Sequence, residues 1–421
     1  MPAPLAPRDN LALRRILTTN TSEMMDWLIG LGVVFVGPMP DPPQRVARMH
    51  NVVPSSRAFT FHLTRFCKRN GVEIRLSTPC TDLIKDGGRI IGVAVGGRSA
   101  ASRQLFARQG VILATGDYSG AADLKKAFGA PALADVEPVA TTSSGDGYRL
   151  GLKAGGSVAN GDIMRGPIMR FVPPAQPNWI QKIPPYRAVG NAIAWAMRTA
   201  PQWILRPFLM KFLTTVLGPS PALFAEGAVL INKDGDRFAD EIDSPAGAVA
   251  HQSPKEAYIV FDESLARKFS AWPYFISTAP GIAYAYIDDY RRCRTDIFRT
   301  GATPGELARK LGIPPDRLES TLKRYNAGER RSRPAIAEAP YYALGPVRSY
   351  VVFTEGGLRI NELFQVLAGG RPIDGLYAVG STGQGGLLLE GHGHHLDWAF
   401  ISGRLAGTYC AQRPRINKRA V

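Results

Sequence analysis

The spacing of apolar residues predicts a chain of mixed helices and strands. Apolar residues recur with a helical period over 11–35, 56–69 and 303–327, and Pro314-Pro315 divides the last of these helices in two. Short apolar or alternating runs predict strands at 71–76, 82–85, 90–95, 110–114, 228–232 and 257–261. Both periods occur throughout the chain, which favours an α/β protein.

A distinctive pattern lies near the C-terminus. An apolar strand at 375–380 leads into a loop with six glycines between Gly380 and Gly393, and a helix of small residues follows to about Cys410. Glycines let backbone N–H groups approach an anion closely, and a helix N-terminus attracts negative charge. This strand, loop and helix therefore predict a place where an anionic group binds.

The composition is that of an ordinary globular protein. A length of 421 residues suits two or three domains, and 45% hydrophobic with 20% charged residues is typical of such folds. The four cysteines are scattered and form no Cys-x-x-Cys pair, so we expect neither disulfides nor zinc but a reducing, cytoplasmic compartment. We find no signal region and no run of 18 apolar residues.

The net charge of +16 limits the possible partners. Basic proteins often bind nucleic acid, anionic lipid or acidic ligands. Lysine and arginine are spread widely here, and the chain has no helix-turn-helix or RNA-binding motif, so we expect no nucleic-acid partner. An arginine-rich genome and attraction to an anionic substrate or membrane stay open as explanations.

One segment, 192–217, combines large apolar residues with basic ones. It includes Trp195 and Trp203, and Pro201 and Pro207 interrupt it. Three interpretations stay open. The segment is a basic amphipathic stretch in peripheral contact with a membrane, the lining of an apolar pocket, or a pair of helices packed in the core.

Five motifs in order resemble the fumarate reductase/succinate dehydrogenase flavoprotein family, the FAD-dependent oxidoreductase 2 family, which includes the 3-ketosteroid dehydrogenases. One is the glycine-rich C-terminal part. The others are Thr78–Leu83, the Ala-Thr-Gly strand at 110–116, the Ser-Gly-Asp-Gly turn at 144–147 and the Arg-Phe segment at 232–241. The similarity runs from about residue 10 to about residue 410.

The resemblance implies an α/β fold with a Rossmann-like FAD-binding domain that is split in sequence. Its parts would be 1–158 and 340–421, and an α+β cap domain that binds the substrate would be inserted at 159–339. The family opens with a strand, a Gly-x-Gly-x-x-Gly turn and a helix, and no such motif occurs in this chain. We therefore expect a truncated chain that lacks this N-terminal βαβ unit.

The resemblance also implies which residues contact FAD, bound without a covalent link. The positions carried over are Cys80, Ala114, Thr115, Gly116, Gly145, Asp146, Gly147, Gly356, Gly357, Gly380, Ser381, Gly385, Gly386, Gly393, His395 and Leu396. The helix that opens near 394–396 would direct its free N–H groups at the N1–O2 edge of the reduced flavin.

Histidines of the last glycine loop are the candidates for moving a proton. The three histidines at 392, 394 and 395 lie where relatives contact the isoalloxazine, and histidine titrates near neutrality. We predict His392 and His394 as catalytic, with Glu390 orienting an imidazole. The alternative is that these side chains only pack. A metal site is the weaker interpretation, because successive residues point apart, and we predict none.

The resemblance implies an FAD-dependent oxidoreductase acting on a CH–CH group next to a carbonyl, with a small-molecule substrate and an electron acceptor that the sequence does not identify. Pro245 and Val352 stand where dicarboxylate-binding relatives carry charge, so we favour a bulky, apolar, steroid-like enone. One alternative is a fumarate-reductase-like enzyme on a carboxylate that Arg165, Arg170 and Arg187 would hold. Another is a truncated, non-catalytic binding module.

Overall fold

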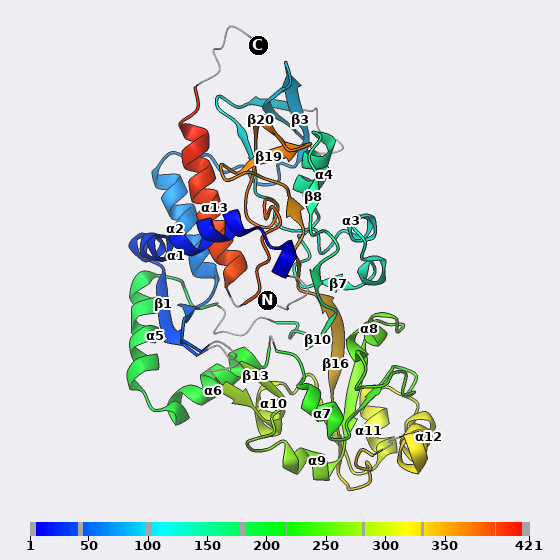
Figure 1. Ribbon diagram of the computed structural model, residues 1–421. Coiled ribbons are helices and arrows are strands. Elements are labelled where there is room, and N and C mark those ends of the chain that lie inside the picture. The colour runs from blue at the N-terminus through cyan, green and yellow to red at the C-terminus, as the bar shows by residue number, and fades with distance from the viewer. Residues whose placement is uncertain are drawn as a thin grey trace. The chain divides into compact units, whose positions relative to one another are not determined.

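The computed structural model describes residues 6–40, 45–96, 103–176, 182–215, 217–279, 283–329, 332–391 and 393–414 (Figure 1). They form two compact units. The first unit consists of Met1–Val33, Phe59–Gly166 and Val351–Val421, and the second of Val34–Ala58 and Pro167–Tyr350. Helices and strands occur in both, so the predicted α/β class is confirmed.

The first unit combines helices with short sheets. Its helices are α1 (Leu11–Leu31), α2 (Arg57–Arg69), α3 (Ala122–Ala127), α4 (Asp146–Lys153) and α13 (His394–Ala411), with 3-10 turns at Ala6–Arg8 and Pro131–Leu133. Its strands are β3 (Cys80–Asp86), β4 (Arg89–Val95), β5 (Arg103–Phe106), β6 (Val111–Leu113), β7 (Glu137–Pro138), β8 (Val158–Ala159), β9 (Met164–Arg165), β17 (Phe353–Thr354), β18 (Gly357–Leu358), β19 (Gln365–Ala368) and β20 (Arg371–Ala378).

A parallel strand pair organises the first unit. Strand β20 runs parallel to β6, with Leu376 opposite Val111, and β19 pairs antiparallel on the other side of β20. The amide of Val379 donates to the Leu113 carbonyl over 3.0 Å, which extends the ladder past the strand ends. Because the strands are parallel, the loops that follow them leave from the same edge of the sheet.

Helix α13 packs beside α1 in this unit, as the red and dark blue helices of Figure 1 show. The hydroxyl of Thr21 donates to the Asp397 carboxylate over 2.7 Å. Burial raises the pKa of Asp397, and this hydrogen bond counteracts part of the rise. The contact holds the first turn of α13 in place.

The second unit is built on a larger antiparallel sheet. Its strands are β1 (Val34–Met39), β2 (Met49–Val53), β10 (Ile168–Phe171), β11 (Val229–Ile231), β12 (Ala257–Phe261), β13 (Ser277–Ala279), β14 (Ala283–Ala285), β15 (Phe298–Gly301) and β16 (Tyr341–Val351). Its helices are α5 (Arg187–Thr199), α6 (Gln202–Leu213), α7 (Pro221–Ala225), α8 (Pro245–Ala250), α9 (Glu263–Lys268), α10 (Ile287–Cys293), α11 (Pro304–Leu311) and α12 (Pro315–Arg324), followed by a π turn at Tyr325–Glu329.

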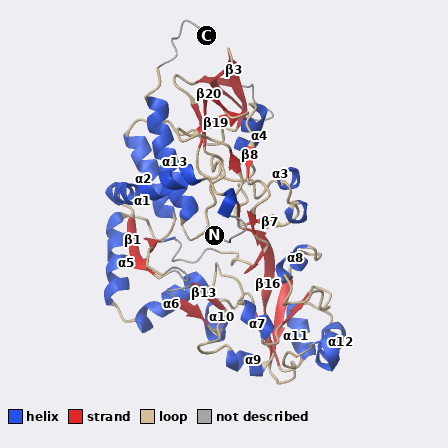
Figure 2. Cartoon of the chain, in the orientation of Figure 1, coloured by secondary structure: helices blue, strands red, loops and turns tan. Residues whose placement is uncertain are grey.

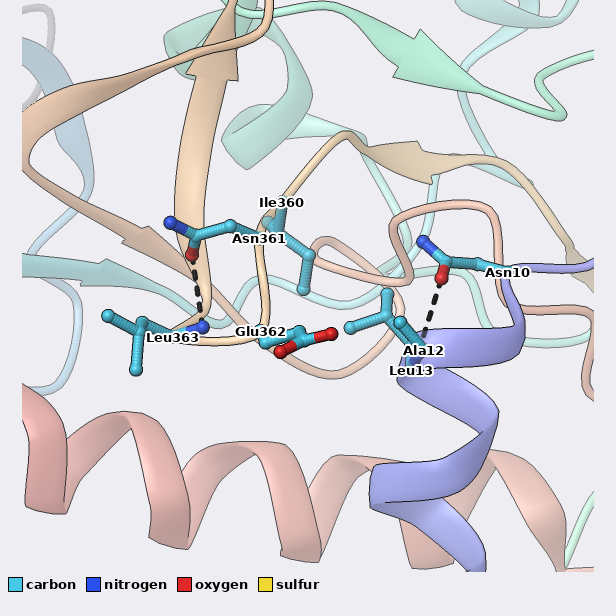
Figure 3. A pocket seen from close by; sticks show the side chains of 7 residues that line it. All are labelled: Asn10, Ala12, Leu13, Ile360, Asn361, Glu362 and Leu363. Atoms are coloured by element: carbon cyan, nitrogen blue, oxygen red, sulfur yellow. Dashed lines mark hydrogen bonds between the residues drawn. The ribbon is translucent and has the colours of Figure 1, made fainter.

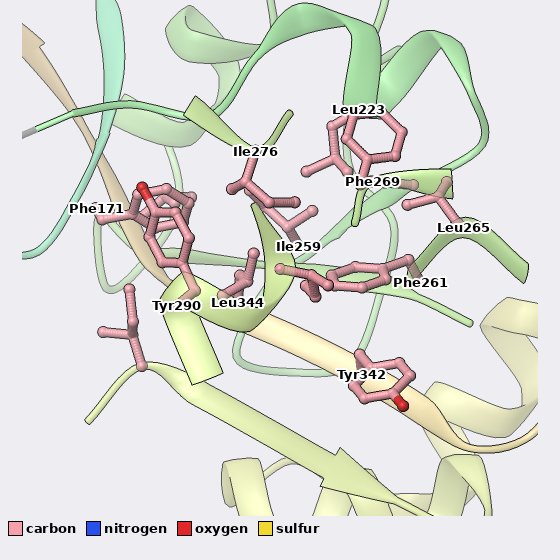
Figure 4. Packing of buried hydrophobic residues seen from close by; sticks show 14 of the residues in the cluster. Phe171, Leu223, Ile259, Phe261, Leu265, Phe269, Ile276, Tyr290, Tyr342 and Leu344 are labelled. Atoms are coloured by element: carbon pink, nitrogen blue, oxygen red, sulfur yellow. The ribbon is translucent and has the colours of Figure 1, made fainter. Parts of the chain in front are cut away.

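The core of the second unit lies on this sheet. The strand order is β10-β16-β12-β11, and β15 also pairs with the long strand β16, seen in red in Figure 2. All five residues of β12 are buried, which explains its unbroken apolar sequence. Figure 4 shows aromatic and aliphatic side chains, among them Phe171, Phe261 and Tyr290, that pack together on one face of the sheet.

Most of the elements expected from the sequence are confirmed. The helices predicted at 11–35, 56–69 and 303–327 are present, and Gly32, in the left-handed region with a φ of 111°, ends the first of them. The predicted strands at 82–85, 90–95, 110–114, 228–232 and 257–261 are also present. Among the described residues, no helix is long and apolar enough to span a bilayer.

The strand predicted at 71–76 is wrong. This segment is irregular, and its alternating apolar residues Val72, Ile74 and Leu76 are exposed, Leu76 at 83%. The reason is that a strand requires a partner for its backbone hydrogen bonds. Within the described ranges no segment pairs with 71–76, so an alternating pattern alone does not produce a strand.

A buried ion cluster supports the turn after β11. The Glu241 carboxylate accepts hydrogen bonds from Arg237 at 2.8 and 2.9 Å and pairs with Arg333 at 3.0 Å. It also accepts the Leu230 amide at 3.1 Å, which attaches the cluster to the strand. Neutralising this carboxylate would remove a buried counter-charge that two guanidinium groups share.

We therefore expect Glu241→Gln to lower the free energy of unfolding by about 3 kcal/mol, measured by urea denaturation. The control is Glu338→Gln, which removes an exposed ion pair with Arg267. That change should destabilise the protein far less, because solvent screens exposed pairs. Equal losses in the two variants would contradict a structural role for the buried cluster.

Candidate functional site

Two threonines bring three loops of the first unit together. The Thr115 amide donates to the Thr382 hydroxyl over 3.1 Å, and that hydroxyl donates to the Gly116 carbonyl over 2.7 Å. The Gly147 amide donates to the Thr115 hydroxyl over 3.0 Å. The loops after β6, before α4 and after β20 therefore meet at one point.

A buried tyrosine adds a fourth segment. The hydroxyl of Tyr148 lies 2.6 Å from the Gly356 carbonyl and 2.7 Å from the Ser381 carbonyl. Burial raises the pKa of Tyr148 well above its usual range, so the hydroxyl keeps the proton that these carbonyls share. Four motifs that are separated in sequence are thus joined by hydrogen bonds.

The glycines of these loops fall into two groups. At Gly145, Gly147, Gly356, Gly357 and Gly385, a Cβ would lie between 2.4 and 2.6 Å from an atom of a neighbouring segment. These positions permit the loops to pack on one another. A Cβ at Gly380 or Gly386 would make only ordinary contacts, at 3.6 and 3.4 Å.

Gly116 and Gly393 differ from this packed group. Their φ angles are 79° and 83°, which favours glycine, and a Cβ at either position would meet no other atom within 4 Å. Gly116 follows β6, and residues 114–116 are exposed. In parallel sheets ligands bind beyond the carboxyl ends of the strands, which is where this open loop lies.

The N-terminus of α13 begins at the second open glycine. Gly393 is its N-cap and has no side chain to accept a bond from the first turn, which contains His394, His395 and the 49% exposed Leu396. The first backbone N–H groups of a helix have no partner within the helix, and its dipole is positive at this end. An anionic oxygen of a ligand fits this position.

Glu355 and His395 bring an acid and an imidazole together in this region. Glu355 Oε1 lies 3.5 Å from His395 Nε2. The imidazole also packs on Phe353, with 4.0 Å between ring centroids, and it is 18% exposed whereas Glu355 is buried. A protected carboxylate therefore faces an imidazole that a ligand can reach.

Further hydrogen bonds fix the Glu355 carboxylate. Its Oε2 accepts the Gln384 side-chain amide at 2.6 Å and the Leu389 backbone amide at 2.9 Å. Burial on its own would raise the pKa of Glu355, but His395 and these donors hold it below the usual value. The geometry favours the ionised form of this carboxyl group.

Gln384 supplies a test of whether the site suits a ligand. The residue is fully buried, and its amide nitrogen also donates to the Leu387 carbonyl over 2.6 Å. Its side-chain oxygen has no hydrogen-bond partner among the residues that the structure describes. A buried acceptor of this kind suits a ligand N–H donor, and with the open glycines it makes this region fit a polar, anionic cofactor.

The predicted catalytic residues are distributed as follows. His392 lies outside the described residues. The ring of His394 lies close to Gly391, where an added Cβ would be 2.8 Å from it, and Glu390 is partly exposed. Among the described residues, no three His, Cys, Asp or Glu side chains are grouped to hold a metal ion.

The remaining predicted cofactor residues surround the same loops or lie on the neighbouring sheet. Cys80 begins β3 opposite Val95, and burial raises the pKa of its thiol. Asp146 is exposed in the first turn of α4. Glu355 was missed by the sequence interpretation, although an acidic side chain directly before Gly356-Gly357 was a visible signal.

A separate pocket of about 440 Å³ lies beside the N-terminus of α1 (Figure 3). The Asn10 side chain accepts the Leu13 amide and donates to the Gly385 carbonyl. The Asn361 oxygen accepts the Leu363 and Gln365 amides. These amide groups already support the chain's own turns, so we assign no ligand to this pocket.

Comparison with known proteins agrees with this geometry. Residues 5–178 and 183–388 match the model of the FAD binding domain family. The NADH:acrylate oxidoreductase of Vibrio harveyi is 26% identical over 413 residues, covering 93% of this chain and 36% of that protein. The 3-oxosteroid 1-dehydrogenase of Mycobacterium tuberculosis is 26% identical over 412 residues, covering 86% of this chain and 64% of the relative.

The fold is also found among solved structures. The open conformation of a flavocytochrome c3 fumarate reductase has a TM-score of 0.68 and 22% identity, and the match covers 96% of this chain and 64% of that one. This chain thus spans less than two thirds of the length of these proteins. On the match over most of its length, the chain belongs to the FAD binding domain family, whose cofactor is FAD.

Proposed function

We propose that this chain is part of an FAD-dependent oxidoreductase that adds or removes hydrogen across a carbon–carbon bond next to a carbonyl. The observation that carries the proposal is the convergence of four loops beside the N-terminus of α13, with open space at Gly116 and Gly393. Relatives named for acrylate and for 3-oxosteroids support the reaction class.

We assign FAD to the converging loops. Residues 114–116 would line it beyond the end of β6, and the first-turn amides of α13 would stabilise negative charge on the flavin ring. When bound, the flavin supplies the hydride chemistry. The chain itself must orient the substrate, exclude water and move one proton.

We propose His395 as the group that holds this proton. Its imidazole is partly exposed at the start of α13, and its Nε2 faces the Glu355 carboxylate. Glu355 is a positioning residue, because its buried oxygens are fixed by Gln384 and Leu389 and it orients and charge-balances the imidazole. The roles predicted for His392, His394 and Glu390 stay predictions.

We favour a bulky, apolar enone as substrate. Phe353 packs on the proposed proton-moving imidazole and gives this side of the site an apolar wall. The Arg165 guanidinium lies 5.9 Å from the centre of the Phe353 ring. This positive charge favours the alternative of a carboxylate substrate. A small-molecule substrate and an electron donor or acceptor from outside the described residues complete the proposed reaction.

Visible absorption of the purified protein tests the cofactor assignment. We expect flavin bands that survive desalting after incubation with FAD. Thr382→Val should weaken this retention and lower the free energy of unfolding by about 1–3 kcal/mol, because it leaves the Thr115 amide and Gly116 carbonyl without their partner.

Thr408→Val is the matched control for that experiment. Thr408 is exposed on α13, and its hydroxyl donates only to the Arg404 carbonyl one turn earlier. This variant should retain FAD like the wild type. A wild-type protein that stays colourless with added FAD would contradict the cofactor assignment for this chain and favour a non-catalytic binding module.

Flavin reduction by a 3-ketosteroid that has a saturated carbon–carbon bond next to its carbonyl tests the proton-moving role, because this bond loses the hydride and the proton. His395→Phe keeps a ring against Phe353 but removes the acid–base group, so we expect kcat to fall about a hundredfold or more while flavin absorbance is kept. His251→Phe, at an exposed histidine of the second unit, should leave kcat unchanged. A larger loss in His394→Phe than in His395→Phe would transfer the role to His394.

The pH dependence of stability tests the state of Glu355. Its folded pKa is depressed, so its contribution is complete above the unfolded value of about 4.5 and is lost as the pH falls through the folded value. The stability difference between wild type and Glu355→Gln should therefore shrink below about pH 4.5. Urea denaturation across this range measures it, and a difference that grows on acidification would contradict the assignment.

A further inference from the structure

Helices α5 and α6 of the second unit present large apolar side chains to solvent. Trp195 on α5 is 64% exposed, and Trp203 and Phe208 on α6 are 75% and 51% exposed. Tyr186, which precedes α5 as its N-cap, is also exposed. Several exposed large aromatic side chains on two consecutive helices are unusual where the helices serve only as core.

The opposite sides of both helices are packed. Ala194 is buried in a cluster with Val36 and Val53, and Met210 and Leu213 belong to the main core of the unit. Arg206 lies on the inner side as well, where it pairs with Asp289 at 2.5 Å. The inner sides of both helices therefore attach the helices to the second unit. The exposed aromatic residues form their outer sides.

The outer face also follows from helical geometry. At about 100° per residue, Trp203, Ile204 and Phe208 fall within one arc of α6, and Lys211 lies inside the same arc. On α5, Trp195 shares its arc with Arg187 and Arg198, which are exposed. Each helix thus carries aromatic and cationic residues on the same outer side.

Charge decides which occupant fits this face. The sequence from 187 to 213 contains no aspartate or glutamate, and the charged residues on the outer sides of the two helices are Arg187, Arg198 and Lys211. A second copy of the chain would bring the same positive face against it, which like charges oppose. An anionic surface is complementary, and tryptophan prefers the boundary between lipid headgroups and acyl chains.

We propose that the outer face of α5 and α6, formed by Trp195, Trp203, Ile204 and Phe208 with the basic residues beside them, binds the surface of an anionic lipid bilayer. The helices have 13 and 12 residues and would lie in the plane of the interface, since they are too short to cross it. The proposal is independent of the proposed reaction, because none of these residues belongs to the candidate site.

Co-sedimentation of the full chain with lipid vesicles tests the proposal. We expect binding to vesicles of phosphatidylcholine with phosphatidylserine, weaker binding to phosphatidylcholine alone, and loss of binding with added salt. Trp203→Glu should reduce the bound fraction at a fixed lipid concentration, with an affinity about tenfold or more lower, because it removes a large apolar group and adds a negative charge.

Phe106→Glu is the matched control. Phe106 is 52% exposed on β5 of the first unit, so its replacement should leave lipid binding unchanged. Circular dichroism and urea midpoints of both variants check that they fold. The proposal is wrong if the wild-type protein does not co-sediment with phosphatidylserine vesicles. It is also wrong if a folded Trp203→Glu variant binds these vesicles as strongly as the wild type. Self-association that Trp203→Glu abolishes would overturn it in favour of a second copy.

Discussion

The contact between Thr115 and Thr382 is the interaction on which the candidate site depends. It joins the ends of two parallel strands that lie about 265 residues apart in the chain, and through the Gly147 amide it also fixes the start of α4. A hydroxyl can both donate and accept, so one side chain satisfies an amide and a carbonyl at the same time. The open Gly116 gains a defined position because the Thr382 hydroxyl binds its carbonyl.

The same region explains why a flavin site can combine rigidity with access. Tyr148, Gln384 and Glu355 are buried and use their polar atoms to hold backbone groups or one another. Gly116 and Gly393 remain open. The buried hydrogen bonds thus make the site rigid, while the exposed glycines leave it accessible. His395 has both properties, because its ring packs on Phe353 while part of the ring stays exposed.

The second unit has a different organisation. Its sheet is antiparallel, its core is apolar, and its buried Glu241 cluster fixes a turn. Helix α6 buries one side in this core, and α5 buries one side against β1 and β2. Both helices leave aromatic and basic residues on the other side. The sequence left three interpretations of 192–217 open, and burial divides the segment, because inner residues such as Met210 pack in the core while Trp203 is exposed.

The sequence by itself determined the family and the helices and strands with the clearest periodicity, because periodicity and glycine-rich motifs are local properties of the chain. It did not determine the state of 71–76, since a strand needs a partner that only the fold can provide. It predicted His392, His394 and Glu390 as catalytic from their position in a loop, which stays a prediction, and it did not single out Glu355. Only the tertiary structure brought Glu355 to 3.5 Å from His395, because that contact depends on loops that meet across the sheet edge.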